Sequence, residues 1–453
     1  MTHLERMFRI RERGSTVGRE VLGGVTTFMA LSYIIFVQPA MMHAAGIPLA
    51  GAFVATCVAS ALACILMGLL ANYPIALAPA MGHNVYFAYV VVLSLGLTWQ
   101  QGLTAVFVGG CVFVLLSFVG FRARLMEIIP DSLKRGIAAG IGLLITFLGL
   151  QYSGLVVGSL ATGVQFGDIH NPTTLLAVFG LALTLALMAL NVRGAVLWGI
   201  VGTTLVGLVG TLAGRPLLNL QTSGHGAFSP ADSMLKLDFA GLFRAEGWLT
   251  IILTFLFLDV FDTVGTLIGV SERAGLLDES GRLPRARWAL FSDAAGTVIG
   301  ALMGTSTVTS YVESAAGVQA GARTGLANMV TAVLFLLALL AYPALAVVAT
   351  CHSYTEDGFL MSQYPVLAPA LIVVGSMMLK SLARLDWDDA TEFLPAFLTA
   401  VLMPLAISIT EGLSFGFISY SALKLVTGRG RDVHWAFHAV SAVLILRYIA
   451  VPP

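Results

Sequence analysis

Charged side chains are scarce in this sequence, in which Lys, Arg, Asp and Glu together make up 11% of 453 residues. Apolar residues make up 58%, far more than a soluble globular protein of ordinary composition carries. A soluble globular domain is therefore excluded. The 24 basic residues balance the 24 acidic ones, and a chain without net charge indicates neither a nucleic acid nor a strongly charged soluble partner.

Cysteine is also rare, and the spacing of the four cysteines is not that of metal ligands. Cys57, Cys64, Cys111 and Cys351 lie in or beside apolar segments, which favours a packing role. The eight histidines form no HExxH or comparable motif. The sequence therefore gives no support to a metal site, and we expect no bound cofactor.

Long apolar runs are what the sequence has in abundance. A helix needs roughly 20 residues to cross a hydrocarbon core of ~30 Å, and about fourteen runs meet that length. We place them at residues 20–42, 48–70, 74–94, 102–120, 134–152, 173–190, 195–213, 247–270, 287–303, 305–321, 324–349, 367–383, 393–409 and 411–426. A shorter run at 434–451 leaves open whether it spans the membrane, lies at its interface or packs against the bundle. The predicted fold class is an all-α polytopic membrane protein.

The Lys and Arg residues predict the orientation, because cytoplasmic loops carry the positive excess. The tail at 1–19 is rich in arginine, so we expect the N-terminus in the cytoplasm and no cleaved signal peptide. Every second loop then agrees, with basic residues after spans 4, 6, 8, 10, 12 and 14. The long loop at 214–246, expected outside, is the exception, with Arg215, Lys236 and Arg244. We expect a multi-pass protein of the cell membrane.

The two halves of the chain echo each other. Seven spans precede the 214–246 loop and seven follow it, and an odd number of spans per copy makes the second copy inverted in the membrane. The third span of each half looks broken. The first reads "NYPIALAPAMGHNVYFAYVVV", with Pro74, Pro79 and Gly82 interrupting a helix. The second reads "GTSTVTSYVESAAGVQAG", whose β-branched start predicts extended backbone before a helical end at 314–321.

Interrupted spans of this kind indicate a binding site for a polar solute. Backbone that is not helical inside a membrane is tolerated only where protein or a water-filled cavity surrounds it, and half-helix N-termini there offer N–H donors. Asn84 and Glu313 lie 229 positions apart, close to the offset of 227 between the starts of spans 1 and 8, so we expect them at corresponding depths.

Carboxylates within the apolar spans are the strongest candidates for the site. Asp259 and Asp262 lie three residues apart in span 8 and therefore share one helical face. An ionised carboxylate at the bilayer centre costs at least ~2.5–3.5 kcal/mol on the insertion scale, so such groups normally face a cavity and carry function. The alternatives are structural roles. Either Asp could form a hydrogen bond between helices, Glu313 could pair with backbone groups left unbonded by the break in its span, and Asn84 could join two helices by a hydrogen bond.

Several weaker candidates surround them. His83 could act in coupling, although a lone helical His is more often a packing residue, and the hydroxyls of Thr309 and Ser310 can support the local backbone. Aromatic rings could sandwich a planar ligand, or simply pack; these are Tyr86, Phe87, Phe261 and Tyr311. Asp293 and Glu392 lie close to expected loop ends, so we set them aside.

These motifs together resemble the AzgA-like purine permeases, a branch of the nucleobase and ascorbate permease superfamily. The resemblance runs from about residue 19 to 447 and rests on "GGVTTFMALSYIIFVQPAMM", "ANYPIALAPAMGHNVYFAY", "FLFLDVFDTVGTLIGVSERAGLLDESGRLPRARWAL", "GTSTVTSYVESAAGV" and "FISYSALKLVTGR". It implies fourteen helices as two inverted seven-helix repeats, with a core domain of spans 1–4 and 8–11 and a gate domain of spans 5–7 and 12–14.

The boundaries that follow divide the chain into six parts. They are a cytoplasmic tail at 1–19, core segments at 20–132 and 247–349, gate segments at 133–213 and 350–453, and the extracytoplasmic loop at 214–246. The resemblance also implies that Asn84, Asp259 and Glu313 bind substrate and that Asp262 assists. It leaves the oligomeric state open, a homodimer included.

The function implied is a transporter and not an enzyme: import of purine bases such as adenine, guanine or hypoxanthine together with protons. In this hypothesis Glu313 and Asp259 accept hydrogen bonds from the base, while Asn84 and the backbone amides at 308–311 donate. The purine itself, the coupling ion (H⁺ or Na⁺) and the carboxylate that carries the proton all remain open. The transmembrane proton gradient takes the place of a cofactor.

The chain departs from the family pattern beside Asn84, where the family usually has Pro-Gly-Met-Gly followed by Leu or Ile and this sequence has Ala80 and His83. That departure keeps open a transporter of the same fold for xanthine, uracil or an organic anion. Carboxylates facing a cavity argue against an anion. An intramembrane hydrolase lacks its Gly-x-Gly-Asp signature here, and a channel would need no coupling carboxylate.

Overall fold

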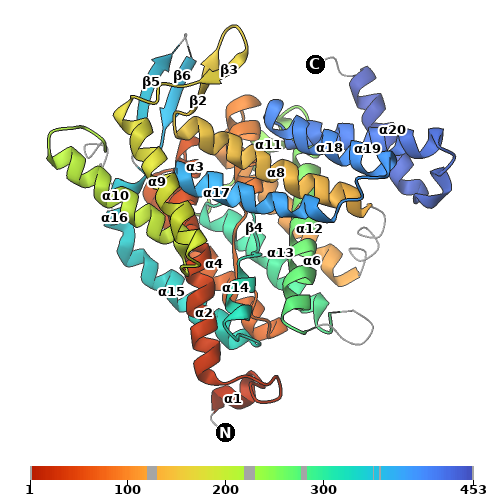
Figure 1. Cartoon of the computed structure of the whole chain (residues 1–453). Coiled ribbons are helices and arrows are strands. Elements are labelled where there is room, and N and C mark those ends of the chain that lie inside the picture. Colours follow the sequence, from red (N-terminus) through yellow and green to blue (C-terminus); the bar gives the residue numbers. More distant parts are fainter. Residues whose placement is uncertain are drawn as a thin grey trace. The chain divides into compact units, whose positions relative to one another are not determined.

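The computed structural model describes residues 3–119, 130–218, 230–276, 283–349, 351–356 and 359–450. The described chain is mainly helical, with short strands between the helices (Figure 1). It divides into two compact units, which are described separately. The first comprises Met1–Val119 and Gly149–Ala370, and the second comprises Gly120–Leu148 and Leu371–Pro453. The division into core and gate domains uses other boundaries and stays a prediction.

The first unit contains most of the helices. Its α-helices within the described residues are α1 (His3–Met7), α2 (Val17–Leu31), α3 (Ile34–Ala44), α4 (Leu49–Leu66), α5 (Met81–Val85), α6 (Trp99–Val119), α9 (Pro172–Ala189), α10 (Ala195–Leu212), α11 (Phe239–Arg244), α12 (Trp248–Arg273), α13 (Ala286–Met303), α14 (Ser314–Gln319), α15 (Gly325–Ala338) and α16 (Tyr342–Val348). Its shorter helical turns are the π-helical η1 (Met67–Ala71) and η2 (Tyr86–Ser94) and the 3₁₀ turns η4 (Pro230–Asp232) and η5 (Leu339–Ala341).

The second unit is built around α18 (Ala390–Leu405), α19 (Ile409–Val426) and α20 (Trp435–Ala450), with the 3₁₀ turns η6 (Leu379–Arg384) and η7 (Gly430–Asp432). It also holds most of α8 (Asp131–Tyr152) and of α17 (Ala368–Met378), each of which has its other end in the first unit. The short run at 434–451 forms α20, which packs against α19: Phe437 is fully buried and stacks on Phe417 with 4.7 Å between ring centroids.

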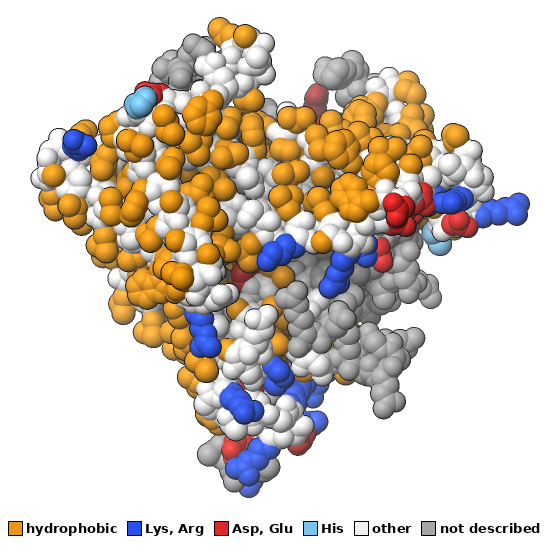
Figure 2. All heavy atoms as spheres, in the orientation of Figure 1, with side chains coloured by type: hydrophobic (Ala, Val, Ile, Leu, Met, Phe, Trp, Pro, Cys, Tyr) orange, Lys and Arg blue, Asp and Glu red, His pale blue; other side chains and the backbone are white. Residues whose placement is uncertain are grey.

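Seven helical segments in the described residues are long and apolar enough to cross a membrane, judged by length and composition. They are Val17–Ala44, Leu49–Ala71, Trp99–Ser117, Asp131–Tyr152, Pro172–Ala189, Ala195–Leu212 and Gly325–Leu345. Hydrophobic side chains cover a broad area of the face drawn in Figure 2, while Lys and Arg gather near α1. The prediction of a helical multi-pass membrane protein is confirmed, and the count of fourteen spans stays a prediction.

The breaks predicted in spans 3 and 10 are confirmed, and the two breaks pair with each other. β1 (Leu77–Pro79) runs antiparallel to β4 (Val308–Ser310), with Ala78 opposite Thr309. The pairing extends beyond the strands through hydrogen bonds from Ala80 N to Thr307 O and from Tyr311 N to Ala76 O, both 2.9 Å. Each strand then leads into a short helix, α5 or α14. The extended backbone therefore satisfies its polar groups within the protein, as an apolar surrounding demands.

Glycine permits the close helix contacts that hold this strand pair in place. A Cβ added at Gly325, the first residue of α15, would lie 2.1 Å from the carbonyl oxygen of Gly68 in η1. A Cβ added at Gly317 in α14 would lie 2.5 Å from the carbonyl oxygen of Gly23 in α2. Both distances are far below van der Waals contact, so small residues are required where these backbones meet.

Two hairpins lie where the sequence predicts only loops. β2 (Val156–Ser159) pairs with β3 (Gly163–Phe166), and β5 (His352–Glu356) pairs with β6 (Phe359–Gln363). Gln363 at the end of β6 is buried and joins α9, because its side chain accepts a 2.6 Å hydrogen bond from the Thr173 hydroxyl. The strands are only four or five residues long, too short for a clear alternation of apolar and polar side chains, so the pattern did not reveal them.

Candidate functional site

Polar side chains from α12 and α13 converge on the strand pair. The most heavily engaged is Asp293 of α13, which is completely buried. Its Oδ1 accepts hydrogen bonds from the amide (2.9 Å) and the hydroxyl (2.8 Å) of Ser310 and, at 3.3 Å, from the Thr309 hydroxyl. Its Oδ2 accepts a 2.5 Å bond from Thr263 of α12. Asp293 thus fixes the end of β4 against two helices.

This role of Asp293 corrects the sequence analysis, which set the residue aside as one near a loop end. α13 begins at Ala286, so Asp293 lies seven residues, or about two turns, inside the helix. The signal was present in the sequence: a carboxylate two turns into an apolar helix has no easy route to water. Nearness to a loop in sequence therefore does not by itself bring a helical side chain to solvent.

Asp259 lies on the same helix as Thr263 and approaches the other end of β4. It is 3% exposed, and its Oδ2 is 3.3 Å from the Thr297 hydroxyl of α13. The same hydroxyl lies 3.0 Å from the carbonyl oxygen of Val308. Asp259 is therefore connected to the strand pair through Thr297. Asp262, predicted to assist, is partly buried and directly precedes Thr263.

Glu313 stands immediately before α14 and faces the break in the first span. The hydroxyl of Tyr33 donates a 3.0 Å hydrogen bond to its Oε1. Tyr33 lies between α2 and α3, where the first predicted span is interrupted. Glu313 is partly buried, and one of its carboxylate oxygens is held in place by Tyr33.

Asn84 is fully buried in α5, and its side chain is held from the other interrupted span. Ser306 donates a hydrogen bond to Asn84 Oδ1, and Asn84 Nδ2 lies 3.8 Å from the sulfur of Met81. Behind Ser306 lies Gln38 of α3, whose Nε2 is 2.7 Å from the Thr305 hydroxyl and 3.4 Å from the Ser306 hydroxyl. Sequence reasoning missed Gln38; a buried amide in the middle of an apolar span was the available signal.

His83 is 2% exposed, and its Nε2 has no hydrogen-bond partner among the described residues. His83 is the neighbour of Asn84 in α5, but this position alone does not place the His83 ring against β1 or β4. The structure therefore joins Thr309 and Ser310 to Asp293, connects Asn84 and Asp259 to β4 and the residues before it, and leaves the roles of His83 and Asp262 as predictions.

Two of the backbone amides expected to donate to a ligand are already occupied. Ser310 N donates to Asp293, and Tyr311 N donates to Ala76 O. The hypothesis that this stretch supplies free amide donors is therefore wrong for these two residues. The Asp293 carboxylate takes the Ser310 amide and the antiparallel pairing takes the Tyr311 amide, whereas sequence reasoning treated each broken span alone.

The aromatic candidates are partly engaged in packing. Tyr86 packs edge to face on Phe255 at 4.9 Å between centroids, and the Tyr311 hydroxyl donates to Pro79 O. Phe87 is completely buried, while the side chain of Phe261 lies outside the described residues. In the described part of the chain, no group of three or more His, Cys, Asp or Glu side chains could hold a metal ion.

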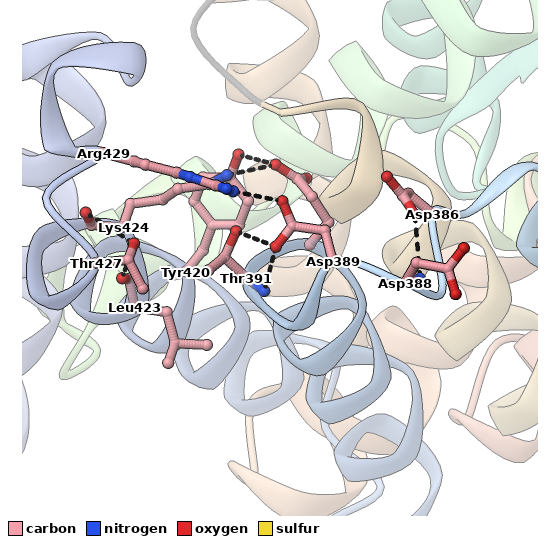
Figure 3. A network of polar contacts seen from close by, with 10 residues as sticks. Asp386, Asp388, Asp389, Thr391, Tyr420, Leu423, Lys424, Thr427 and Arg429 are labelled. Carbon is pink, nitrogen blue, oxygen red and sulfur yellow. Dashed lines mark hydrogen bonds and ion pairs between the residues drawn. The ribbon is translucent and has the colours of Figure 1, made fainter.

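A second polar cluster lies in the second unit, where α18 begins and α19 ends (Figure 3). Lys424, only 6% exposed at its side chain, forms a 2.7 Å ion pair with Glu392, which also accepts a 3.0 Å bond from Tyr420. Arg429 pairs with Asp389 at 2.7 Å. Glu392 is thus a tie between two helices, and a cavity of about 480 Å³ opens beside it.

Hydrogen bonds from the hydroxyl and the amide of Thr391, together with Arg429, lower the pKa of the Asp389 carboxyl to about 2. Asp389 is the N-cap of α18, and its Oδ1 accepts both Thr391 bonds, at 2.7 and 2.9 Å. The cluster therefore ties α18 to the chain beyond α19 by charge as well as by capping.

Known proteins resemble this chain along nearly its whole length. The family described as "Permease family" matches residues 18–415. The adenine permease AdeP of Escherichia coli is 41% identical over 99% of this chain and 96% of its own, and the guanine/hypoxanthine permease PbuG of Bacillus subtilis is 41% identical over 98% and 99%. The transmembrane domain of the cyanobacterial bicarbonate transporter BicA is 16% identical, with a TM-score of 0.62 over 88% of this chain and 97% of that one.

Proposed function

Because the chain belongs to this permease family, and is a transporter and not an enzyme, we propose that it imports purine nucleobases of the adenine, guanine or hypoxanthine class by proton symport. The observation that carries the proposal is the agreement between two findings. An adenine permease and a guanine/hypoxanthine permease are each 41% identical to the chain over nearly its whole length. Of the residues chosen from the sequence, Asn84 and Glu313 lie in the two interrupted spans, and Asp259 is connected to the strand pair through Thr297.

The chemistry of the site suits a planar base with N–H donors and ring-nitrogen acceptors. Asp259 and Glu313 present carboxylate oxygens, which only accept while ionised. Asn84 is the one of the three whose side chain can also donate. Charge-assisted hydrogen bonds to a base are about twice as strong as neutral ones, so the two carboxylates anchor the base and Asn84 completes the set.

Alternating access is the proposed mode of transport. Pro79 and Val308 are opposite each other in the strand pair and differ by 308 − 79 = 229 positions, the same offset as Asn84 and Glu313. Because the strands are antiparallel, the other two pairs differ by 309 − 78 = 231 and 310 − 77 = 233 positions. Antiparallel pairing of corresponding segments from the two halves supports two inverted repeats that meet at the site. The core domain then shifts against the gate domain around the bound base.

Proton coupling is assigned to the carboxylates at the site. A purine base is neutral, so an imposed proton gradient can drive it only if a group in the protein binds and releases H⁺ together with the base. Asp259, Asp262 and Glu313 are the candidates. Replacing Glu313 with Gln keeps its size but removes the exchangeable charge, so we expect gradient-driven uptake to be lost while the protein still folds and inserts. Uptake that kept its full pH dependence would remove Glu313 from this role.

The alternative is a transporter of the same fold for xanthine, uracil or an organic anion. The likeness to a bicarbonate transporter domain, at 16% identity, is a likeness of fold. The carboxylates of Asp259, Asp293 and Glu313 at the strand pair disfavour an anion, since like charges repel strongly where water is excluded.

We place the N-terminus in the cytoplasm and the protein in the cell membrane, and propose a homodimer as its assembly.

The decisive experiment is uptake of labelled hypoxanthine, adenine, guanine, xanthine and uracil by cells that lack their own base transporters. It is done with and without an imposed inward proton gradient, and again with a sodium gradient. Saturable, proton-driven uptake of one purine is the expected result. Transport of none of the five bases by protein shown to be in the membrane would refute the proposal and direct attention to a site altered at Ala80 and His83.

A further inference from the structure

Three buried polar side chains from different parts of the chain form one hydrogen-bonded series. Gln38 lies in α3, Ser306 lies in the segment between α13 and β4, and Asn84 lies in α5; none has any exposed surface. Gln38 Nε2 reaches the Ser306 hydroxyl at 3.4 Å, and that hydroxyl contacts Asn84 Oδ1. Buried polar groups are costly unless each donor meets an acceptor, so the direction of these bonds is constrained.

The direction follows from what each atom can do. The thioether of Met81 is an acceptor without a hydrogen, so the amide nitrogen of Asn84, and not its oxygen, belongs beside it at 3.8 Å. The amide oxygen then faces Ser306, whose single hydrogen must be donated to it. Ser306 can consequently only accept from Gln38. Gln38 has two amide hydrogens to give, and the second is taken by the Thr305 hydroxyl at 2.7 Å.

The consequence lies at Asn84. The Asn84 amide oxygen accepts from Ser306. Of the two hydrogens on its amide nitrogen, one makes the weak contact to the Met81 sulfur, and the described residues offer no acceptor for the other. The amides of Ser310 and Tyr311 are also taken. A ligand at this place therefore meets a side-chain donor, and a ligand group that itself donates there would leave two hydrogens facing each other.

We propose that Gln38 and Ser306 are positioning residues that orient the Asn84 amide, so that the site selects a base carrying a hydrogen-bond acceptor, a ring nitrogen or a carbonyl, opposite Asn84 Nδ2. This inference rests on the proposed function, because it specifies how that same site chooses its substrate. Neither residue needs to touch the base. Their effect passes through the orientation of one amide, which would otherwise be free to rotate and offer either its donor or its acceptor.

The test uses analogues of the transported purine in which one ring nitrogen at a time is replaced by C–H. Kinetics of uptake are measured for the parent base and for each deaza analogue. In the unaltered protein, one analogue should show a KM raised about tenfold or more, because a buried donor loses its acceptor. The other analogues should change less. The sensitive position identifies the ring nitrogen that faces Asn84.

Four variants then separate the effect of the hydrogen-bonded series Gln38–Ser306–Asn84, called the relay below, from a general loss of folding or transport. Ser306→Ala removes the link, Gln38→Met removes the donor without adding charge, and Gln38→Glu replaces the donor with an acceptor of equal size. Gln165→Glu, on the exposed strand β3, is the matched control for adding a carboxylate. In the first three, the KM of the parent base should rise about tenfold with little change in maximal rate, and the penalty of the sensitive analogue should shrink toward onefold.

The outcomes distinguish the relay from the function it serves. Undiminished discrimination in Ser306→Ala and Gln38→Met would overturn the relay while leaving base transport established. Full activity in Gln38→Glu combined with loss in Gln38→Met would show that the bonds run in the opposite direction. If Gln38→Glu does not yield a monodisperse protein, the two uncharged variants decide. Failure of the unaltered protein to transport any base would refute the proposed function itself.

Discussion

Asp293 is the side chain on which the shape of the site depends most directly. Replacing it with Ala would leave the amide and hydroxyl of Ser310 and the hydroxyl of Thr263 without their acceptor in a buried place. Each such loss costs about 1–3 kcal/mol. We expect Asp293→Ala to lower the melting temperature of the purified protein and to abolish uptake, and Asp293→Asn, which keeps one acceptor oxygen, to retain part of both.

Asp168 supplies the control for that measurement, since it lies in an exposed loop and, within the described part of the chain, its side chain accepts a hydrogen bond from the backbone of His170. Asp168→Ala should leave uptake and melting temperature nearly unchanged. If Asp293→Ala transports as well as Asp168→Ala does, the hydrogen bonds between Asp293 and the end of β4 have no role in transport. The comparison separates loss of a carboxylate in general from loss of this one.

Asp389 gives a prediction about pH. Its pKa in the folded protein is lowered to about 2, below the value of about 3.9 for an unperturbed Asp. Its charge therefore stabilises the fold above pH 4, and this contribution is lost as the pH falls from about 4 toward 2. Asn can still cap a helix, so Asp389→Asn removes chiefly the charge.

We therefore expect Asp389→Asn to melt below the unaltered protein from pH 5 to 8 by a constant margin, and the margin to close between pH 4 and 2. Melting temperatures of the detergent-solubilised proteins across this range provide the measurement. A margin that persisted at the lowest pH would mean that Asp389 acts through its shape and not through its ionised carboxyl.

Among the helices, the contact between α15 and η1 offers the sharpest test of packing. A Cβ at Gly325 would lie 2.1 Å from a backbone oxygen, which cannot move aside as a flexible side chain could. Gly325→Ala should therefore destabilise the protein by about 1–3 kcal/mol, the usual cost of overpacking. Gly18 in α2, where an added Cβ meets nothing within 4 Å, is the matched control and should tolerate Ala. Equal melting temperatures for the two variants would contradict the close approach.

The breaks in spans 3 and 10 could be predicted because Pro79, Gly82 and the β-branched run before Ser310 each disfavour a helix locally. Their antiparallel pairing could not, because it joins residues more than 220 positions apart. The same limit applies to Gln38, whose partner Ser306 lies 268 positions away in the sequence. Asp293 differs, because its partner Ser310 lies only 17 positions away; its place near an expected loop end hid the burial of its carboxylate. Local pattern identifies the elements, whereas long-range contacts determine which polar groups remain available to a ligand.

At the scale of the whole molecule, labelling of cysteines can show which side of the membrane a segment of the chain faces. Cys57 and Cys64 are buried; Cys111, within the apolar helix α6, and Cys351, in the segment that precedes β5, are partly exposed. The loop at 351–366 contains no Lys or Arg, so the positive-inside rule places it outside the cell. A membrane-impermeant maleimide should therefore label the protein in intact cells, and Cys351→Ser should remove most of that label.

The opposite face needs its own reporter, and Arg11 in the tail is suitable because its side chain is 63% exposed. In a Cys351→Ser background, Arg11→Cys should be labelled only after the cells are permeabilised. Since an odd number of spans separates the two sites in the proposed topology, they must react from opposite sides. Labelling of both from the same side would require an even number between them, and the inverted relation of the two halves, on which alternating access depends, would fall with it.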